Sequence, residues 1–381
     1  MQGVSKEISD RLADHIRNDT TDMAPSDLIV PAANFSDPVH AEREFALMRA
    51  QYLIITHMAE LPNPGSFITR DVLGTPVLVT RKRDGKVAAF RNMCRHRGGK
   101  VELEESGRKP FFVCSYHGWS YESSGKLRGV PFQESFELKD RECRNLHAID
   151  CEERHGFIWI RIDGRSEESV ADFLGEETDA HFPVFELEKK GVYRTETVEV
   201  DVNWKLIMDG ASDILHPQFL HANGVGKLLT SNISAFHELG RNGQSYSPRR
   251  RLLDAVKASE DYDLDWRYFG ANMFVWPNSM VLPTPDHIEF WTVWPLSVDR
   301  SRIHIRFLIE QERMTERVTS RIDKSWEILK QAALEEDFPM EETIQRNAAA
   351  NPQEPFLYGR SELSIQRLHQ VLEKELANFD G

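Results

Sequence analysis

Cysteine is scarce in this sequence, with only four in 381 residues. That number excludes the dense disulfide framework on which small secreted domains depend. Two of the four, Cys94 and Cys114, stand close to histidines at spacings typical of metal ligands, which favours a reducing compartment. We expect the other two, Cys143 and Cys151, to be ordinary buried residues.

Long apolar runs and an excess of positive charge are also absent. No window approaches the roughly 18 apolar residues that a membrane span requires, and the N-terminal segment lacks the apolar core of a signal peptide. Lys and Arg number 47 against 61 Asp and Glu, so the formal charge of −14 should repel a nucleic-acid backbone. We therefore expect a cytoplasmic protein that acts on neither membranes nor nucleic acids.

Length and residue patterning indicate two domains. A chain of 381 residues is too long for one ordinary compact domain. Short runs of β-branched and aromatic residues, separated by glycine-containing turns, predict a small all-β domain over residues 45–160. A polar stretch at 163–168 marks its end. Residues 1–44 and 161–381 combine helical periodicity with a strand-rich region at 273–310, which predicts a larger α+β domain.

The first candidate metal site consists of two short motifs, Cys94-x-His96 and Cys114-x-x-His117, each in a predicted loop of the all-β domain. Two thiolates and two imidazoles can bind one zinc ion or a Rieske [2Fe–2S] cluster, in which two histidines replace two cysteines on one iron. Zinc fingers tend to pair Cys with Cys and His with His along the chain. Here each loop supplies one of each, and this order favours the Rieske cluster over structural zinc.

The second candidate site is Asp213-x-x-His216-x-x-x-x-His221. Non-haem iron that activates dioxygen is typically held by two histidines and one carboxylate, with open positions for oxygen and substrate. Asp213 and His216 would share one face of a helix, whereas His216 and His221 would lie about 140° apart around it. Pro217 biases His216 out of the α-helical conformation, so we expect the helix to break between the two histidines and let both converge.

Both sites lie in recognisable surroundings. The segments Cys94-Arg95-His96-Arg97-Gly98 and Cys114-Ser115-Tyr116-His117-Gly118-Trp119 resemble the Rieske motifs of the α subunits of aromatic-ring-hydroxylating oxygenases. The segment from Asn203 to His221 resembles the part of the same family that supplies two iron-binding histidines. The resemblance extends from about residue 40 to the end of the chain. Ser115 stands where the family often has proline, at a position that is not a ligand.

This resemblance implies a fold and a set of ligands. The fold is α+β, with a small all-β Rieske domain joined to a larger, helix-grip-like catalytic domain in which helices cover a central antiparallel sheet. The implied ligands of the [2Fe–2S] cluster are Cys94, His96, Cys114 and His117. Those of the mononuclear iron are His216, His221 and Asp337. Glu336 and Glu341 are the alternatives to Asp337.

The resemblance also implies a role for Asp213 other than metal binding. In the family the corresponding carboxylate joins a Rieske histidine of one subunit to an iron histidine of the next, which provides a short path for electrons. An enzyme of this kind must be oligomeric to work. The resemblance implies a ring of three α subunits, with or without a separate β subunit.

The implied function is that of a terminal oxygenase. Electrons enter at the Rieske cluster, and dioxygen is used at mononuclear Fe(II) to hydroxylate or dihydroxylate a hydrophobic substrate, which we expect to be aromatic. A Rieske monooxygenase that removes an O- or N-alkyl group would use the same ligands and stays an alternative. A non-catalytic Rieske electron carrier is a more distant one.

The source of the electrons must lie outside this chain. Gly224-Val225-Gly226-Lys227 lacks the third glycine of a dinucleotide-binding loop and follows no predicted strand. We therefore expect NAD(P)H to act through a separate flavin reductase, a ferredoxin or both. Basic residues near the cluster loops form a candidate docking patch for such a partner: Arg95, Arg97, Lys100, Arg108 and Lys109.

The substrate pocket beside the iron should be apolar, because most sites for organic ligands are. Seven apolar side chains of the larger domain are candidates to line it: Ile207, Met208, Leu215, Phe219, Phe274, Val281 and Phe290. This composition does not select one hydrophobic substrate over another.

Overall fold

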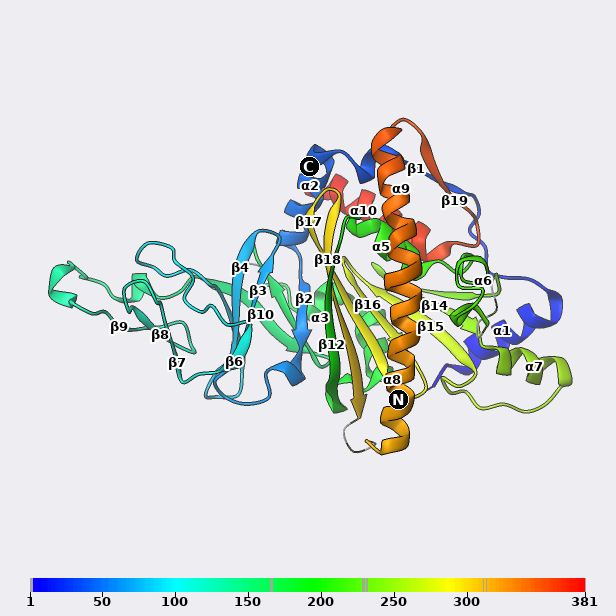
Figure 1. The fold of residues 1–381 in the computed structure, drawn as a ribbon, viewed down its shortest axis with the longest axis horizontal. Coiled ribbons are helices and arrows are strands. Elements are labelled where there is room, and N and C mark those ends of the chain that lie inside the picture. The colour runs from blue at the N-terminus through cyan, green and yellow to red at the C-terminus, as the bar shows by residue number, and fades with distance from the viewer. Residues whose placement is uncertain are drawn as a thin grey trace. The chain divides into compact units, whose positions relative to one another are not determined.

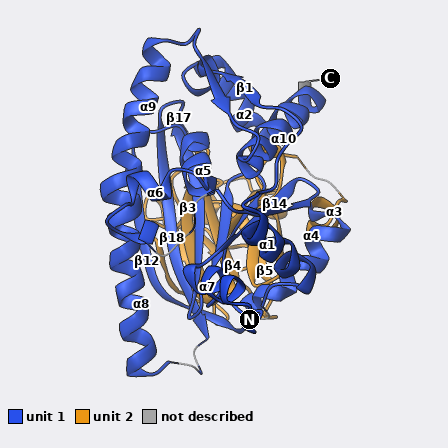
Figure 2. Cartoon of the chain, turned by 90° about the vertical axis from the view of Figure 1, so that its right-hand side faces the viewer, with its two compact units in different colours: residues 1–47, 174–381 blue, residues 48–173 orange. Residues whose placement is uncertain are grey.

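The computed structural model describes residues 3–164, 167–227, 230, 232–310, 312 and 314–380. The chain divides into two compact units, one of residues 48–173 and the other of residues 1–47 together with 174–381 (Figure 2). The smaller unit thus begins and ends later than the all-β domain expected at 45–160.

The smaller unit includes the polar stretch 163–168, where the sequence predicts a boundary. Within that stretch, Arg165 and Ser166 lie outside the described residues. The chain that follows them is tied to the unit: Tyr52 donates from its hydroxyl to the Glu168 carbonyl at 3.1 Å, and the Val170 amide donates to the Glu152 side chain at 2.9 Å. These bonds explain why the compact unit continues to residue 173.

The smaller unit is built from antiparallel strands, as the sequence predicts. One seven-stranded sheet has the order β2-β11-β10-β5-β4-β3-β6, and a three-stranded sheet has the order β7-β8-β9. The strands are β2 (Leu53–His57), β3 (Ser66–Val72), β4 (Thr75–Arg81), β5 (Val87–Arg91), β6 (Ser106–Arg108), β7 (Phe111–Val113), β8 (Ser120–Glu122), β9 (Leu127–Gly129), β10 (Ala148–Arg154) and β11 (Phe157–Arg161).

The hairpin of β4 and β5 shows how local sequence produces this fold. The dipeptide Asp84-Gly85 between two apolar runs predicts a tight turn. In the structure Gly85 has φ +82°, a conformation that glycine adopts without strain, and the Asp84 side chain accepts the Lys86 amide at 3.0 Å. The turn therefore sets a register in which Val79 lies opposite Ala89.

The larger unit is organised around one seven-stranded antiparallel sheet with the order β12-β18-β17-β16-β15-β14-β13. Its strands are β12 (Lys190–Val200), β13 (Ala235–Leu239), β14 (Asn242–Pro248), β15 (Phe269–Val275), β16 (Ser279–Pro283), β17 (Ile288–Ser297) and β18 (Arg300–Glu310). Helices lie along this sheet (Figure 1). The expected α+β fold with a central antiparallel sheet and covering helices is confirmed.

The N-terminal helix of the larger unit buries one face. In α1 (Lys6–Asn18), Ile8, Leu12 and Ile16 are buried at intervals of one helical turn and share an apolar cluster with Tyr246 of the sheet. The other helices are α4 (Glu176–His181), α5 (Trp204–Ser212), α6 (Pro217–Leu220), α7 (Arg250–Ala258), α8 (Glu316–Leu329), α9 (Phe338–Ala350) and α10 (Leu363–Asp380). Near the unit limits lie α2 (Pro38–Ala50) and α3 (Val170–Leu174), and β1 (Leu28–Pro31) pairs with β19 (Pro355–Tyr358).

A wide helical turn joins α8 to α9, and Figure 1 shows the two as one long rod beside the sheet. Thr315 caps the start of α8 by accepting the Val318 amide. The segment Lys330–Asp337 is a π-helix, and α9 begins directly after it with a proline in its first turn, where no amide donor is needed. Wide turns of this type occur often at functional sites. This one carries Glu336 and Asp337.

None of the described helices combines the length and apolarity that crossing a membrane would require. All four cysteines are free thiols, and Cys94 and Cys114 are buried. Cys151 on β10 is half-buried, but Cys143 is exposed. The expectation that Cys143 is buried is therefore wrong, because this residue lies in a single short turn, Glu142–Arg144, at the surface.

Candidate metal centres

Two loops of the smaller unit have the same backbone conformation around their cysteines. In the first, the Cys94 amide donates to the Gly99 carbonyl at 2.8 Å and the Gly98 amide donates to the Cys94 carbonyl at 2.9 Å. In the second, Cys114 makes the equivalent bonds with Trp119 and Gly118, both at 2.9 Å. Gly98 and Gly118 have φ of +80° and +73°, where an L side chain is strained. Each loop thus presents one cysteine and, two or three residues later, one histidine.

The four side chains of these loops face one another. The Nδ1 atoms of His96 and His117 are 3.2 Å apart, and the cysteines are 4% and 2% exposed. The ring of Trp119 stacks on His96 with centroids 5.1 Å apart. Among the residues that the structure describes, this set is not gathered tightly enough for a single ion. Ligands of a two-iron cluster need not converge on one point, so the arrangement fits [2Fe–2S] better than zinc.

Tyr121 on β8 contacts the cluster loop. Its hydroxyl accepts the Arg95 amide at 3.0 Å, which leaves its proton free to donate to Cys94 Sγ at 3.4 Å. Hydrogen bonds to cluster sulfurs stabilise the reduced, more negative state. We expect Tyr121→Phe to keep the cluster but lower its reduction potential, as measured by a redox titration of the visible absorption. Tyr52→Phe removes a hydroxyl from the same unit and should leave the potential unchanged, and an unchanged potential in Tyr121→Phe would contradict the argument.

In the larger unit, the two candidate iron histidines stand at the two ends of α6. His216 is its N-terminal cap and His221 its C-terminal cap. The expectation that Pro217 moves His216 out of the α-helical region is wrong, since His216 has φ −68° and ψ −26°. The chain instead turns earlier, where α5 ends at Ser212 and Asp213 is extended. Asp213 and His216 therefore do not share a helix face, and the single turn of α6 brings the histidines together.

The side chains of His216, His221 and Asp337 converge. Their two Nε2 atoms are 3.1 Å apart, and Asp337 Oδ1 lies 3.4 Å from the first and 3.1 Å from the second. One ligand atom from each residue lies within 4.8 Å of the others. Two imidazoles and a carboxylate on one side of an open space are the donors that non-haem iron(II) favours. The donor set therefore fits this metal.

A carboxylate stands behind each histidine. Asp213 Oδ2 is 3.0 Å from His216 Nδ1, and Glu336 Oε2 is 2.5 Å from His221 Nδ1. Each bond holds a proton on Nδ1 and turns Nε2 toward the common point, where it can bind a metal ion once it has lost its own proton. The sequence suggests Glu336 only as an alternative ligand. In the structure it orients His221 from the side away from Asp337.

Acidic neighbours also change the proton affinity of the site. Burial lowers the pKa of His216, but Asp213 and Asp337 outweigh burial and raise it to about 9. A metal ion must displace that proton, so binding releases protons and weakens as the pH falls. Glu341, the other alternative ligand, does not belong to the converging set. Burial and the charges of Asp337 and Asp209 raise the pKa of Glu341 well above its ordinary value.

A cavity of about 460 Å³ opens beside the three converging residues, within the range of sites for small organic ligands. Of the seven apolar residues expected to line it, Ile207 does so. Phe219 is 74% exposed, and the large residues of the sheet are buried in the core. The lining is instead mixed, with Trp291, Glu341 and several polar side chains. Composition alone cannot separate core from pocket wall, because both are rich in apolar residues.

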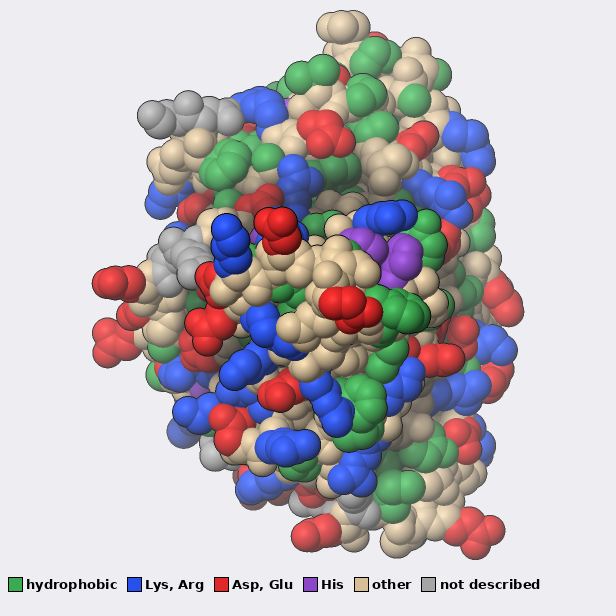
Figure 3. Space-filling model, turned by 90° about the vertical axis from the view of Figure 1, so that its left-hand side faces the viewer, with side chains coloured by type: hydrophobic (Ala, Val, Ile, Leu, Met, Phe, Trp, Pro, Cys, Tyr) green, Lys and Arg blue, Asp and Glu red, His purple; other side chains and the backbone are tan. Residues whose placement is uncertain are grey.

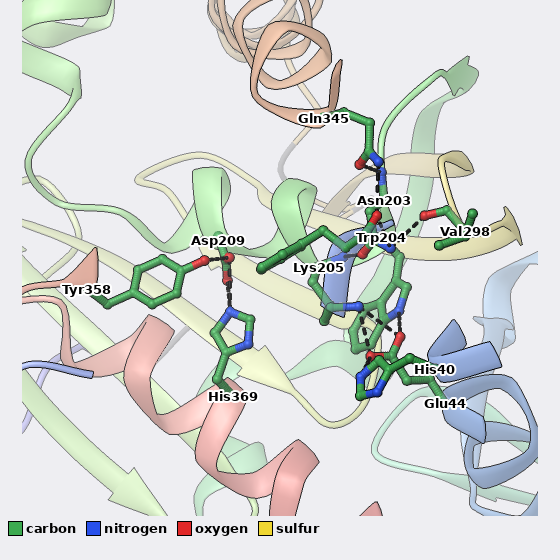
Figure 4. Close-up of polar contacts among 11 residues, drawn as sticks. His40, Glu44, Asn203, Trp204, Lys205, Asp209, Val298, Gln345, Tyr358 and His369 are labelled. Atoms are coloured by element: carbon green, nitrogen blue, oxygen red, sulfur yellow. Dashed lines mark hydrogen bonds and ion pairs between the residues drawn. The ribbon is translucent and has the colours of Figure 1, made fainter. Parts of the chain in front are cut away.

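Buried polar bonds hold α5 in place. Glu44 of α2 binds Lys205 through both oxygens at 2.8 and 2.9 Å and accepts the indole N–H of Trp204 at 2.8 Å (Figure 4). Asn203 caps the helix, and its amide donates to the side chain of Gln345 on α9 at 2.9 Å. These bonds link α5, which leads to Asp213, to the helix that follows Asp337.

A second buried group lies further along α5. Asp209 accepts the hydroxyl of Tyr358 at 2.6 Å and lies 3.0 Å from His369 Nε2 (Figure 4). These partners stand on β19 and α10, about 150 residues away in the sequence. No local spacing predicts them, so only the folded chain reveals the group.

The basic residues near the cluster loops are mostly engaged with their neighbours. Lys100 pairs with Asp71 at 3.2 Å and Lys109 with Glu102 at 2.7 Å. Figure 3 shows basic and acidic side chains interspersed over one face of the molecule. The docking patch stays a prediction.

Two family models match this chain. One, described as the ring hydroxylating alpha subunit (catalytic domain), covers residues 187–378, and the other, the Rieske [2Fe-2S] domain, covers residues 51–146. Each spans the part of the chain that carries one of the two candidate centres.

Curated relatives include dioxygenase and monooxygenase components. The large oxygenase component of the naphthalene 1,2-dioxygenase system of Ralstonia sp is 32% identical over 218 residues, which covers 54% of this chain and 47% of that protein. The oxygenase subunit of glycine betaine monooxygenase from Pseudomonas aeruginosa is 30% identical over 185 residues, covering 48% and 42%. The chain thus matches about half the length of these relatives.

The fold also matches solved structures. The quaternary ammonium Rieske monooxygenase CntA, solved with an inhibitor, superposes with a TM-score of 0.78 and covers 98% of this chain and 99% of its own. The sequence identity is 19%, so this likeness shows the fold alone.

Proposed function

We propose a function on one premise: the chain belongs to the family of ring-hydroxylating α subunits and carries a Rieske [2Fe–2S] domain. It is the terminal component of an oxygenase system, which uses electrons from the cluster and dioxygen to hydroxylate or dihydroxylate a hydrophobic substrate. The convergence of His216, His221 and Asp337 beside a cavity carries this proposal. A pure electron carrier would need neither this second ligand set nor the cavity.

In this proposal, two separate groups of residues in the chain bind the two metal centres. Cys94, His96, Cys114 and His117 would hold the cluster, and His216, His221 and Asp337 would hold the mononuclear iron. When bound, the iron supplies the reaction with dioxygen at its open positions. Asp213 and Glu336 orient the iron histidines, and the buried bonds of α5 keep Asp213 in place. The cavity positions the substrate and excludes bulk water from it.

Asp213 would also connect the two centres of neighbouring subunits. Its side chain is 20% exposed, and while Oδ2 accepts from His216, Oδ1 accepts from the Leu215 amide and has a second lone pair that a partner could use. A histidine of a second subunit could donate to it, as the family resemblance implies. On this proposal the protein works as an oligomer, a homotrimer with or without a β subunit, and receives electrons from a reductase, a ferredoxin or both. We place it in the cytoplasm.

Asp213→Asn is expected to lower turnover about 10- to 100-fold while both metal centres stay bound, because the amide cannot hold the His216 proton in the same way. Stopped-flow measurement of oxidation of the reduced cluster by dioxygen in the presence of substrate would report the slowed transfer. Asp201→Asn, at a side chain 84% exposed, is the matched control. Normal transfer rates in Asp213→Asn would remove Asp213 from the electron path.

Metal analysis and product analysis together test the function. The anaerobically purified protein should contain two irons and two sulfides for the cluster and one further iron. With a surrogate reductase and an aromatic panel, oxygen uptake should accompany product formation. A chain without the additional iron, or with zinc in its place, contradicts the proposal.

The second candidate function is a Rieske monooxygenase. Its support is the match to the glycine betaine monooxygenase subunit, which is nearly as similar as the dioxygenase components. The two functions use the same ligands and differ in where the cavity holds the substrate. A cis-diol product indicates dihydroxylation of a ring, whereas release of an aldehyde indicates removal of an alkyl group.

A further inference from the structure

One carboxyl oxygen in the cavity wall has no hydrogen-bond partner among the described residues. Glu341 is 6% exposed and lines the cavity. Its Oε2 atom is buried without a hydrogen-bond partner among the described residues. Glu341 stands one helical turn after Asp337 on the same face of α9, so its side chain lies close to the iron ligands. A polar group in this position is costly unless something binds it.

The neighbouring helix α5 makes room for this carboxyl. Gly210 lies in α5, and a Cβ atom added there would stand 2.1 Å from Glu341 Oε1. Gly210 is not among the residues with positive φ, so the backbone does not require glycine. Glycine is also a poor helix former. Space for the Glu341 carboxyl is therefore the reason that the structure offers for glycine at this position.

The other acidic residues of the cavity wall have partners. Asp286 pairs with Arg321 at 2.8 Å, and Glu289 lies at ion-pair distance, 3.5 Å, from His287 Nε2 without a hydrogen bond to it. Asp213 and Asp337 contact the iron histidines. Three further lining residues carry buried polar atoms without a hydrogen-bond partner among the described residues, the Asn272 Oδ1, His287 Nε2 and Trp291 Nε1 atoms. The wall thus has hydrogen-bonding capacity that the protein itself does not use.

We infer, resting on the proposed function, that Glu341 determines specificity by hydrogen-bonding a polar group of the substrate close to the carbon that reacts. The substrate class is then an apolar molecule with an oxygen or nitrogen substituent, rather than a bare hydrocarbon. A hydrocarbon would cover the Glu341 carboxyl without satisfying it. A site built to hydrogen-bond a substituent rejects the analogue that lacks it far more strongly than an apolar pocket rejects a missing methylene.

Binding of matched ligands tests this inference without turnover. The probes are naphthalene, 1-naphthol and 2-naphthol, measured by equilibrium dialysis against the anaerobic, iron-loaded protein with its cluster oxidised. We expect at least one naphthol to bind about tenfold or more tightly than naphthalene. In Glu341→Leu this ratio should fall to about one or reverse, because the apolar side chain favours the hydrocarbon. Glu341→Gln retains hydrogen-bonding atoms and should keep part of the preference.

Two further variants separate this role from a structural one. Gly210→Ala leaves Glu341 intact but displaces its carboxyl, so the ratio should fall here also. Glu342→Leu changes the adjacent glutamate, which is 37% exposed and pairs with Arg346 at 3.8 Å, and should leave the ratio unchanged. Circular dichroism melting of each variant shows that it is folded. If Glu341→Leu is not folded, Gly210→Ala takes its place, and an unchanged ratio in that variant overturns the inference.

Failure of this inference can be distinguished from failure of the proposed function. Naphthols that bind no better than naphthalene, or a ratio unchanged in Glu341→Leu, overturn the inference even if iron and turnover are present. A protein that keeps the ratio but lacks the mononuclear iron overturns the proposed function and leaves the polar cavity standing.

Discussion

Replacing His221 by alanine is expected to abolish turnover while the Rieske cluster stays in place. His221 Nε2 contacts both Asp337 and His216, so its loss removes one of three converging donors. The remaining imidazole and carboxylate should not retain iron through purification. In the proposed function the reaction with dioxygen depends on that metal, so we expect turnover to fall about a thousandfold or more, to the background rate.

Metal content distinguishes this result from general damage. In His221→Ala, iron should drop by the mononuclear equivalent while acid-labile sulfide and the visible absorption of the cluster are unchanged. His304→Ala alters a histidine on β18 outside the cavity and should keep both centres. If His221→Ala retains all its iron and turns over normally, the assignment of the mononuclear site is wrong.

The largest expected effect on stability is at the buried pair of Glu44 and Lys205. Both side chains are 0% exposed, and no water can compensate one charge when the other is removed. We expect Glu44→Gln to lower the free energy of unfolding of the larger unit by about 3–5 kcal/mol, the usual cost of breaking a buried pair. The double variant Glu44→Gln with Lys205→Met removes both charges and should recover much of the loss.

Urea unfolding at several pH values provides the measurement. Burial raises the pKa of Glu44, but Lys205 and His40 outweigh burial and hold the pKa below its ordinary value of 4.5. The stabilisation by ionised Glu44 is therefore present above about pH 4.5 and is lost as the pH falls through the lower pKa of the folded state. The difference between wild type and Glu44→Gln should narrow in acid. A difference below about 1 kcal/mol at pH 7 would contradict this account.

The spacing of residues within short motifs was enough to predict most residues of the two candidate sites. Each cluster loop closes within six residues of its cysteine, and α6 places His216 and His221 at its ends, so short motifs were sufficient to bring those residues together. Asp337 lies more than a hundred residues beyond them. Several acidic residues surround it in the sequence, and only the family resemblance pointed to it.

The features that the sequence did not predict depend on contacts between elements far apart in the chain. Pro217 disfavours a helical His216 in general, yet His216 adopts that conformation as the N-terminal cap of α6, where its amide donates to Asp213. Gly210 and Glu341 meet because α5 packs on α9. In the sequence, a glycine inside an apolar helix indicated that another group approaches the helix closely, but it did not identify that group as Glu341. The sequence likewise did not identify the partner of Glu44, because Lys205 lies on another helix, α5.

The π-helical segment that ends at Asp337 determines the direction in which the later side chains of the rod point. Neighbouring residues on a regular helix point about 100° apart, yet Glu336 and Asp337 both reach His221. Deleting one residue from 330–335 would rewind the rod and rotate Asp337, Glu341 and Gln345 together away from α5. The length of this segment, more than its composition, therefore decides which carboxylates meet the histidines, and a single-codon deletion that removes none of these carboxylates would be enough to separate them from the histidines.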